Sequence, residues 1–165
     1  MEIAIETLGV TRCRQCGGNV PEGETCADRF NVLLALDHSR QEPWGSRHGL
    51  AFAAYTLQHS AGIGSNVLEN SWLMLSRVFE HGDDRQVVVK GIRATYRGRH
   101  ETTYSRDNRI SQEAWQASTL PVRKAPPNIF TVTIADLGEF PAHLYAAQLD
   151  AWCLATMNAW KTNDE

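Results

Sequence analysis

Three cysteines, Cys13, Cys16 and Cys26, lie close together near the start of the chain. Two residues separate Cys13 from Cys16, and Gly17 follows them with the freedom to adopt the positive φ that a tight turn requires. Such a turn directs two thiolates at one metal ion, and the third cysteine adds another soft ligand. The spacing therefore predicts a zinc knuckle, with zinc as the bound cofactor. The alternative is three reduced cysteines without a metal, with Cys26 simply buried.

A tetrahedral zinc site with three cysteines needs one further ligand. We expect His48 to supply it, because a histidine in the first turn of a helix faces the positive end of the helix dipole and stays neutral. The predicted metal ligands are therefore Cys13, Cys16, Cys26 and His48. His59 is the second choice. Cys153 is expected to pack as a small hydrophobic residue in the last helix.

The number of ligands decides what such a site can do. A complete set of three cysteines and one histidine has no free coordination position, so it holds structure together and does not activate water. If only the three cysteines bind, a water molecule or a substrate takes the fourth position, and the site becomes a candidate for catalysis.

The segment that carries His48 also carries Tyr55 and His59 on the same helical face. The two histidines are eleven residues apart, about 16 Å along a helix, so they cannot bind one ion. We expect His59 to hydrogen-bond carbonyl groups at the end of its helix. The weak catalytic candidates are His59, Tyr55 and His143, with the first two sharing a polar pocket with Gln58. His143 is expected to face solvent.

The length indicates one domain, and the helical periodicity along the chain predicts a mainly α fold, a helical bundle with an N-terminal zinc knuckle. Its 165 residues are 42% hydrophobic and 21% charged, which is typical of a globular domain. Within this single domain we expect a zinc knuckle at 1–27, a helical core at 28–97, a loop-rich connector at 98–130 and a C-terminal helical segment at 131–161.

Helical periodicity and capping residues predict where the helices lie. The expected helices cover residues 28–37, 46–59, 66–82, 84–97, 111–118 and 141–160. Asp28 is expected to cap the first, and Thr133 with Asp136 forms a capping box before the last. Three tryptophans on apolar stripes are expected in the core, and Trp44 is expected to be more exposed. The three are Trp72, Trp152 and Trp160.

Charge and hydropathy limit the partners. The net charge is −3 and the pI is near 6.1, so the whole chain has no general attraction for nucleic acid. No run of about 18 apolar residues and no secretory signal is present, so we expect a cytoplasmic protein without a membrane partner. The stretch from Arg85 to Arg109 holds seven Lys or Arg against two Asp or Glu. It is a weak candidate for nucleic-acid binding, and a solvated surface is the favoured interpretation.

The sequence resembles an uncharacterised bacterial family of small zinc-knuckle proteins that is known only as a domain of unknown function. The pattern is Cys-x2-Cys-Gly, a third Cys before a helix, a helix of the form His-x6-Tyr-x2-Gln-His, a Thr-Val strand with an Asp, and a Trp-rich last helix. The matching residues are Cys13, Cys16, Gly17, Cys26, His48, Tyr55, Gln58, His59, Thr131, Val132, Asp136, His143, Trp152 and Trp160. The family usually has proline where Ser60 stands, and residues 85–130 match no part of the pattern. The resemblance implies a metal site without implying a reaction.

Two functions from different classes remain. The favoured one is a zinc-stabilised binding or regulatory domain, whose partner is an unknown small molecule or protein. No Ser/His/Asp, Walker or Rossmann motif is present, which supports it. The alternative is a small metal-dependent or histidine-assisted enzyme, which uses an open zinc position or the pocket around His59 and Tyr55.

Overall fold

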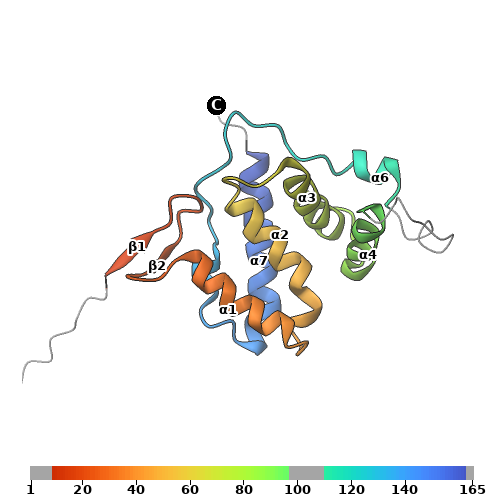
Figure 1. The fold of residues 1–165 in the computed structure, drawn as a ribbon. Coiled ribbons are helices and arrows are strands. Elements are labelled where there is room, and N and C mark those ends of the chain that lie inside the picture. The colour runs from red at the N-terminus through yellow and green to blue at the C-terminus, as the bar shows by residue number, and fades with distance from the viewer. Residues whose placement is uncertain (1–8, 97–109, 163–165) are drawn as a thin grey trace, which may run out of the picture.

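The computed structural model describes residues 9–96 and 110–162, and helices dominate these residues (Figure 1). Two short strands pair antiparallel, with Thr11 opposite Val20. The mainly α fold expected from the sequence is confirmed. The elements are β1 (Val10–Arg12), β2 (Asn19–Pro21), α1 (Cys26–His38), the 3-10 turn η1 (Gly45–Arg47), α2 (His48–Gln58), α3 (Ser65–Phe79), α4 (Arg85–Tyr96), α6 (Gln112–Gln116), the 3-10 turn η2 (Ile134–Leu137) and α7 (Ala142–Lys161).

Helix α2 lies at the centre of the bundle and packs against α3 and α7 (Figure 1). Ala51, Ala53 and Ala54 of α2 are all buried. Their small side chains allow the neighbouring helices to pack closely. The indole N–H of Trp160 in α7 donates a hydrogen bond of 3.0 Å to the carbonyl of Leu57. This bond satisfies one of the carbonyls that the end of a helix leaves without a partner inside the helix.

The tryptophans lie where the apolar stripes place them. Trp72, Trp152 and Trp160 are buried, which confirms the prediction, and each removes a large apolar surface from water. Trp44 is more exposed than these three, as expected, and its indole N–H donates to the carbonyl of Phe140 at 3.0 Å.

The ends of the helices follow local hydrogen bonding. Helix α1 begins at Cys26 because Thr25 caps it: the Thr25 hydroxyl accepts from the Asp28 N–H, and the Asp28 carboxylate accepts from the Thr25 N–H at 2.9 Å. Asp28 is therefore the third residue of the helix and not its cap, which corrects the sequence-based prediction. The capping box of Thr133 and Asp136 is confirmed, and as expected it begins a short turn, η2.

The N-terminal hairpin was not anticipated beyond its cysteine turn. In Figure 1 the chain after α6 crosses the top of the bundle and descends beside this hairpin to reach α7. The N–H of Phe130 donates to the carbonyl of Cys16 at 3.3 Å, which fastens the descending segment to the hairpin turn. Thr131 and Val132 lie in this segment and are not in a strand, contrary to what the resemblance implied.

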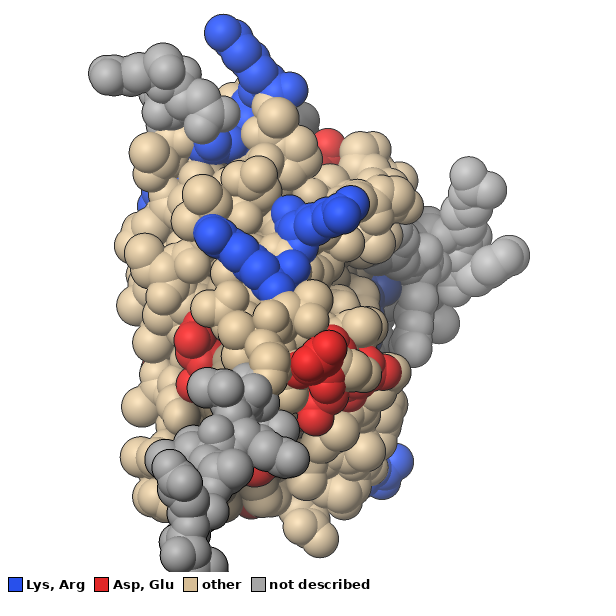
Figure 2. Space-filling view, turned by 90° about the vertical axis from the view of Figure 1, so that its left-hand side faces the viewer, with Lys and Arg blue, Asp and Glu red and all other residues tan. Residues whose placement is uncertain are grey.

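Charges of both signs lie on the side of the molecule that carries the hairpin (Figure 2). Figure 2 shows the side of the molecule on the left of Figure 1, where Lys and Arg lie above Asp and Glu and neither sign dominates. Of the basic stretch, Arg85 is engaged with the carbonyl of Ser46 at 3.1 Å, and Lys90 and Arg93 are exposed on α4. Its remaining arginines fall outside the described residues. None of the helices at 9–96 and 110–162 combines the length and the apolar character needed to span a bilayer.

The capping box of α1 supplies a test of this fold. Thr25→Ala removes the hydroxyl that accepts from Asp28, so we expect a loss of about 1 kcal/mol in the free energy of unfolding. Thr25→Ser keeps the hydroxyl and is the matched control, with a much smaller loss. Urea denaturation followed by circular dichroism measures both, and equal losses in the two variants would contradict the role of the cap.

Candidate metal centre

The hairpin turn positions the first two cysteines. The Cys13 N–H donates to the Gly18 carbonyl at 2.8 Å, and the Gly17 N–H donates back to the Cys13 carbonyl at 2.9 Å. Gly17 has a φ of 77°, the left-handed conformation that glycine adopts without strain. The Gly18 N–H then donates to the Cys16 sulfur at 3.4 Å. A backbone N–H aimed at a sulfur favours its thiolate form, which is the form that binds a metal.

The other two residues come from helix ends. Cys26 is the first residue of α1, and His59 directly follows the last residue of α2. The His59 ring is held by the carbonyl of Tyr55, which lies 3.0 Å from Nδ1. That carbonyl can only accept, so the bond places the ring proton on Nδ1 and leaves the lone pair of Nε2 for a metal.

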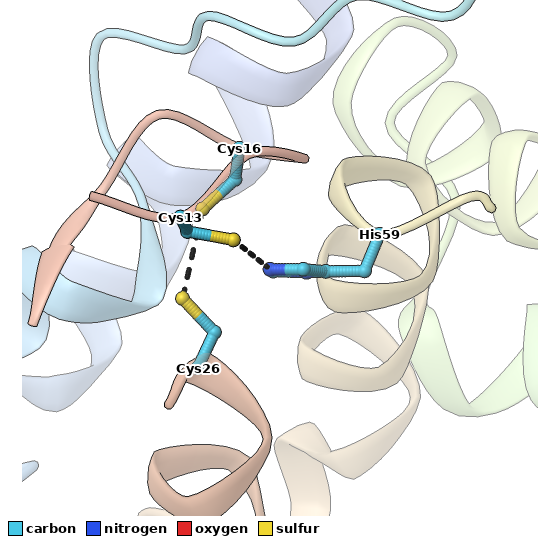
Figure 3. A group of neighbouring side chains, drawn as sticks. All are labelled: Cys13, Cys16, Cys26 and His59. Atoms are coloured by element: carbon cyan, nitrogen blue, oxygen red, sulfur yellow. Dashed lines mark hydrogen bonds between the residues drawn. The ribbon is translucent and has the colours of Figure 1, made fainter. Parts of the chain in front are cut away.

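The four side chains converge on one point (Figure 3). Their donor atoms all lie within 4.8 Å of one another. The sulfurs of Cys16 and Cys26 are 3.7 Å apart, and the sulfur of Cys13 is 3.6 Å from Nε2 of His59. Zinc bonds of ordinary length at tetrahedral angles require about 3.8 Å between two sulfurs and about 3.5 Å between sulfur and nitrogen. The residues present therefore fit a tetrahedral ion.

Aromatic rings fix the orientation of His59. Tyr55 stacks on Phe30 of α1, with ring centroids 3.9 Å apart, and His59 stacks on Tyr55 at 4.2 Å. The side-chain amide oxygen of Gln15 accepts from the N–H of Ala61 at 3.1 Å, which ties the hairpin turn to the loop after α2. The imidazole is thus held in place before any ion binds.

Burial and proximity change the acidity of the thiols. Cys16, Cys26 and His59 are buried, with His59 only 8% exposed, and Cys13 is half-buried. The hydrogen bond with the Cys26 thiol lowers the pKa of Cys16 to about 4, and the same bond raises the pKa of Cys26. Without a metal, the two sulfurs therefore share one proton, which an arriving cation displaces.

The position of His48 differs from the sequence-based prediction. The structure brings His59, not His48, to the three cysteines, which corrects the assignment of the fourth ligand. His48 begins α2 at the opposite end from His59, and its Nδ1 lies 2.8 Å from a carboxylate oxygen of Asp37. The position of His48 in the first turn of its helix does not determine which end of α2 packs against the cysteine turn.

The remaining candidates are placed as follows. Burial, with the nearby cysteine sulfurs, raises the pKa of Tyr55 to about 12, so its phenol stays protonated and is a poor base. His143 is exposed near the start of α7, as expected. Cys153 is fully buried in α7 as predicted, and burial raises the pKa of its thiol. Gln58 points away from the cysteines and donates to Thr156 and to the carbonyl of Val132.

Comparison with known proteins places the chain in a family. A model described as "Family of unknown function (DUF5946)" matches residues 11–161. The chain belongs to this family. The match includes residues 85–130, for which the sequence pattern offered no counterpart, and it covers all four residues of the cluster. No curated protein and no solved structure matches the chain.

The close approach of Gly18 to η2 provides a second test. A Cβ at this position would lie 2.4 Å from the hydroxyl oxygen of Thr133, which is itself held by the carboxylate of Asp136. We expect Gly18→Ala to lower the free energy of unfolding by about 1–3 kcal/mol, because the hairpin must move away from η2.

Thr133→Ala removes the hydroxyl that the new methyl group meets. In that background Gly18→Ala should cost less, and a double-mutant cycle by urea denaturation measures the coupling. Additive losses would show that Gly18 is required for another reason.

Proposed function

We propose that the chain is a zinc-stabilised helical domain that acts in binding or regulation. The observation that carries the proposal is the convergence of Cys13, Cys16, Cys26 and His59 at distances that suit one tetrahedral ion. Three sulfurs and one imidazole nitrogen are a donor set that zinc prefers in structural sites, and harder ions such as calcium and magnesium take oxygen ligands. A reducing compartment such as the cytoplasm keeps these thiols available to the metal.

The complete donor set favours a structural ion over a catalytic one. A catalytic zinc keeps one position open for water, and here His59 supplies the fourth donor. The alternative enzyme, with water on an ion held by three cysteines, requires His59 to lie elsewhere. Its Nε2 is instead 3.6 Å from the Cys13 sulfur, with the ring proton directed at a backbone carbonyl.

The ion would join α1 and α2 to the hairpin, which shares little apolar surface with them. All three residues of β1 are exposed, so the hairpin brings few side chains to the core. The four ligands belong to the hairpin turn, the start of α1 and the end of α2. Because a metal that binds only the folded arrangement adds its binding free energy to folding, the ion would stabilise these junctions.

The metal and its fourth ligand are tested together. The purified protein should contain about one zinc per chain by elemental analysis, with iron and other metals well below that level. His59→Ala should lower zinc retention strongly during dialysis against a weak chelator, because it removes a ligand. His48→Ala is the matched control on the same helix and should keep the zinc. Removal of zinc by a strong chelator should lower the midpoint of thermal unfolding.

Three results would contradict the proposal. A fully folded protein without metal would exclude a structural ion. Equal zinc retention in the His59 and His48 variants would exclude His59 as the fourth ligand. Zinc that stays bound in the His59 variant and carries an exchangeable water would favour the enzyme alternative.

A further inference from the structure

A groove lies between α2, α3 and α4, at the other end of α2 from the metal centre. Its volume is about 410 Å³, within the range of small-molecule sites. Its walls are mainly apolar and include Phe52, Met74 and Ile92. Phe52 is 42% exposed, which is unusual for a large aromatic side chain in the central helix of a bundle. An apolar group bound here would cover that exposed surface.

A second hollow of about 260 Å³ adjoins the groove. The two share Gly49, Val89 and Arg93 in their walls, so they are compartments of one cleft. Gly49 lets α3 and α4 pack closely against α2 at this point, because a Cβ there would lie 3.0 Å from a methyl carbon of Val89 and 3.3 Å from the methyl carbon of Met74. The cleft therefore has an apolar compartment and, beside it, a compartment lined by more polar residues.

The second compartment is more polar than the first, and it is basic. Lys90, Arg93, Gln86 and Ser46 line it, and none of its lining residues is acidic. Within residues 9–96 and 110–162, neither Lys90 nor Arg93 has a carboxylate within ion-pair distance, whereas Arg77 and Arg47 do. Two cations side by side without an acidic neighbour favour an anion, and Arg93 stands where the two compartments meet.

His48 adds a directed hydrogen-bonding group to the same compartment. Its Nδ1 is engaged by the carboxylate of Asp37, whose side chain is only 1% exposed, and the His48 side chain is 38% exposed. The buried carboxylate engages Nδ1 and so orients the ring, and Nε2–H of the protonated ring would donate to an anion. His48 is thus oriented by Asp37 at the start of α2, away from the cysteine cluster.

We propose that this cleft binds a small amphiphilic anion. The acidic group lies in the polar compartment with Lys90, Arg93 and His48, and the apolar part lies along Phe52, Met74 and Ile92. The proposal rests on the binding role suggested above and names the class of ligand, but it does not involve the zinc ion. The two ends of α2 then have separate tasks, one for the metal and one for the ligand.

Isothermal titration calorimetry of the full-length, zinc-loaded protein with octyl phosphate tests the proposal. Octyl phosphate should bind at least about 100-fold more tightly than inorganic phosphate, because its chain removes apolar surface from water. It should also bind more tightly than octan-1-ol, which has the chain without the charge. Equal affinity for octyl phosphate and octan-1-ol would overturn the anionic part of the proposal, and equal affinity for inorganic phosphate would overturn the apolar part.

Matched variants locate the site. Arg93→Gln should weaken octyl phosphate binding about tenfold, since hydrogen bonds to a charged group are among the stronger ones. Lys124→Gln, an exposed charge elsewhere, should have no effect. Phe52→Ala should weaken binding, and Leu154→Ala, an equally exposed apolar residue of α7, should not. Unchanged affinity in both Arg93→Gln and Phe52→Ala would overturn the assignment of the cleft, as would the absence of octyl phosphate binding.

The histidines separate this proposal from the zinc proposal. His48→Ala should lose affinity for octyl phosphate and keep its zinc, and His59→Ala should lose zinc. If zinc content is as expected but His48→Ala binds octyl phosphate normally, the ligand site is wrong and the metal site stands. If octyl phosphate binding follows the cleft variants in a protein that binds no zinc, the metal site is wrong and the ligand site stands.

Discussion

The imidazole of His59 joins the N-terminal hairpin to the helical bundle. One ring nitrogen is held by the carbonyl of Tyr55 at 3.0 Å, and the other faces the sulfur of Cys13 at 3.6 Å. The hairpin presents mostly exposed residues, so apolar burial alone fixes it weakly. The position of Cys13 and Cys16 relative to α2 therefore depends on this histidine, on the stacked ring of Tyr55 and on the segment that contacts Gly18.

Helix α2 is mainly apolar along its length and has a histidine at each end. Its alanines allow α3 and α7 to pack closely, and each terminus carries a histidine held by an oxygen of the protein. At the first residue, the buried carboxylate of Asp37 holds His48. Directly after the last residue, a carbonyl of the helix itself holds His59. The same residue type thus has two environments, which differ in the group that fixes the ring and in what the second nitrogen faces.

Local chemistry in the sequence was sufficient for much of the fold. A hydroxyl and a carboxylate residue three apart marked the start of η2 at Thr133, and apolar stripes placed Trp72 and Trp160 in the core. The same pair at Thr25 and Asp28 was interpreted one turn late, with Asp28 as the cap. The cysteine spacing indicated the cluster, and Gly17 has the predicted positive φ.

The fourth member of the cluster could not be obtained in this way. The helix dipole favoured His48 over His59 as the ligand, because it keeps a histidine neutral at the start of a helix. The direction in which α2 packs against the hairpin is set by contacts that are distant in sequence. His59 was expected to hydrogen-bond a carbonyl at the end of its helix, and its Nδ1 does so. The expectation left out the second ring nitrogen, Nε2, which faces the sulfur of Cys13. The four-residue spacing of Tyr55 and His59 was the local signal for their stacking. The hairpin was missed because its strands are three residues each and mostly exposed.

The order of the ligands along the chain has a consequence for synthesis. All four donor residues lie within the first 59 of 165 residues, so they leave the ribosome long before α7. The three cysteines close a loop of few residues, and the entropy lost on closing a loop is smallest when the loop is short. If the cluster holds an ion, its three cysteines would therefore be available first, and His59 would join them once α2 has formed. The segment at 128–135, which packs against Gly17 and Gly18, is synthesised after all four donor residues, so the cluster can assemble before the cysteine turn is packed against this segment.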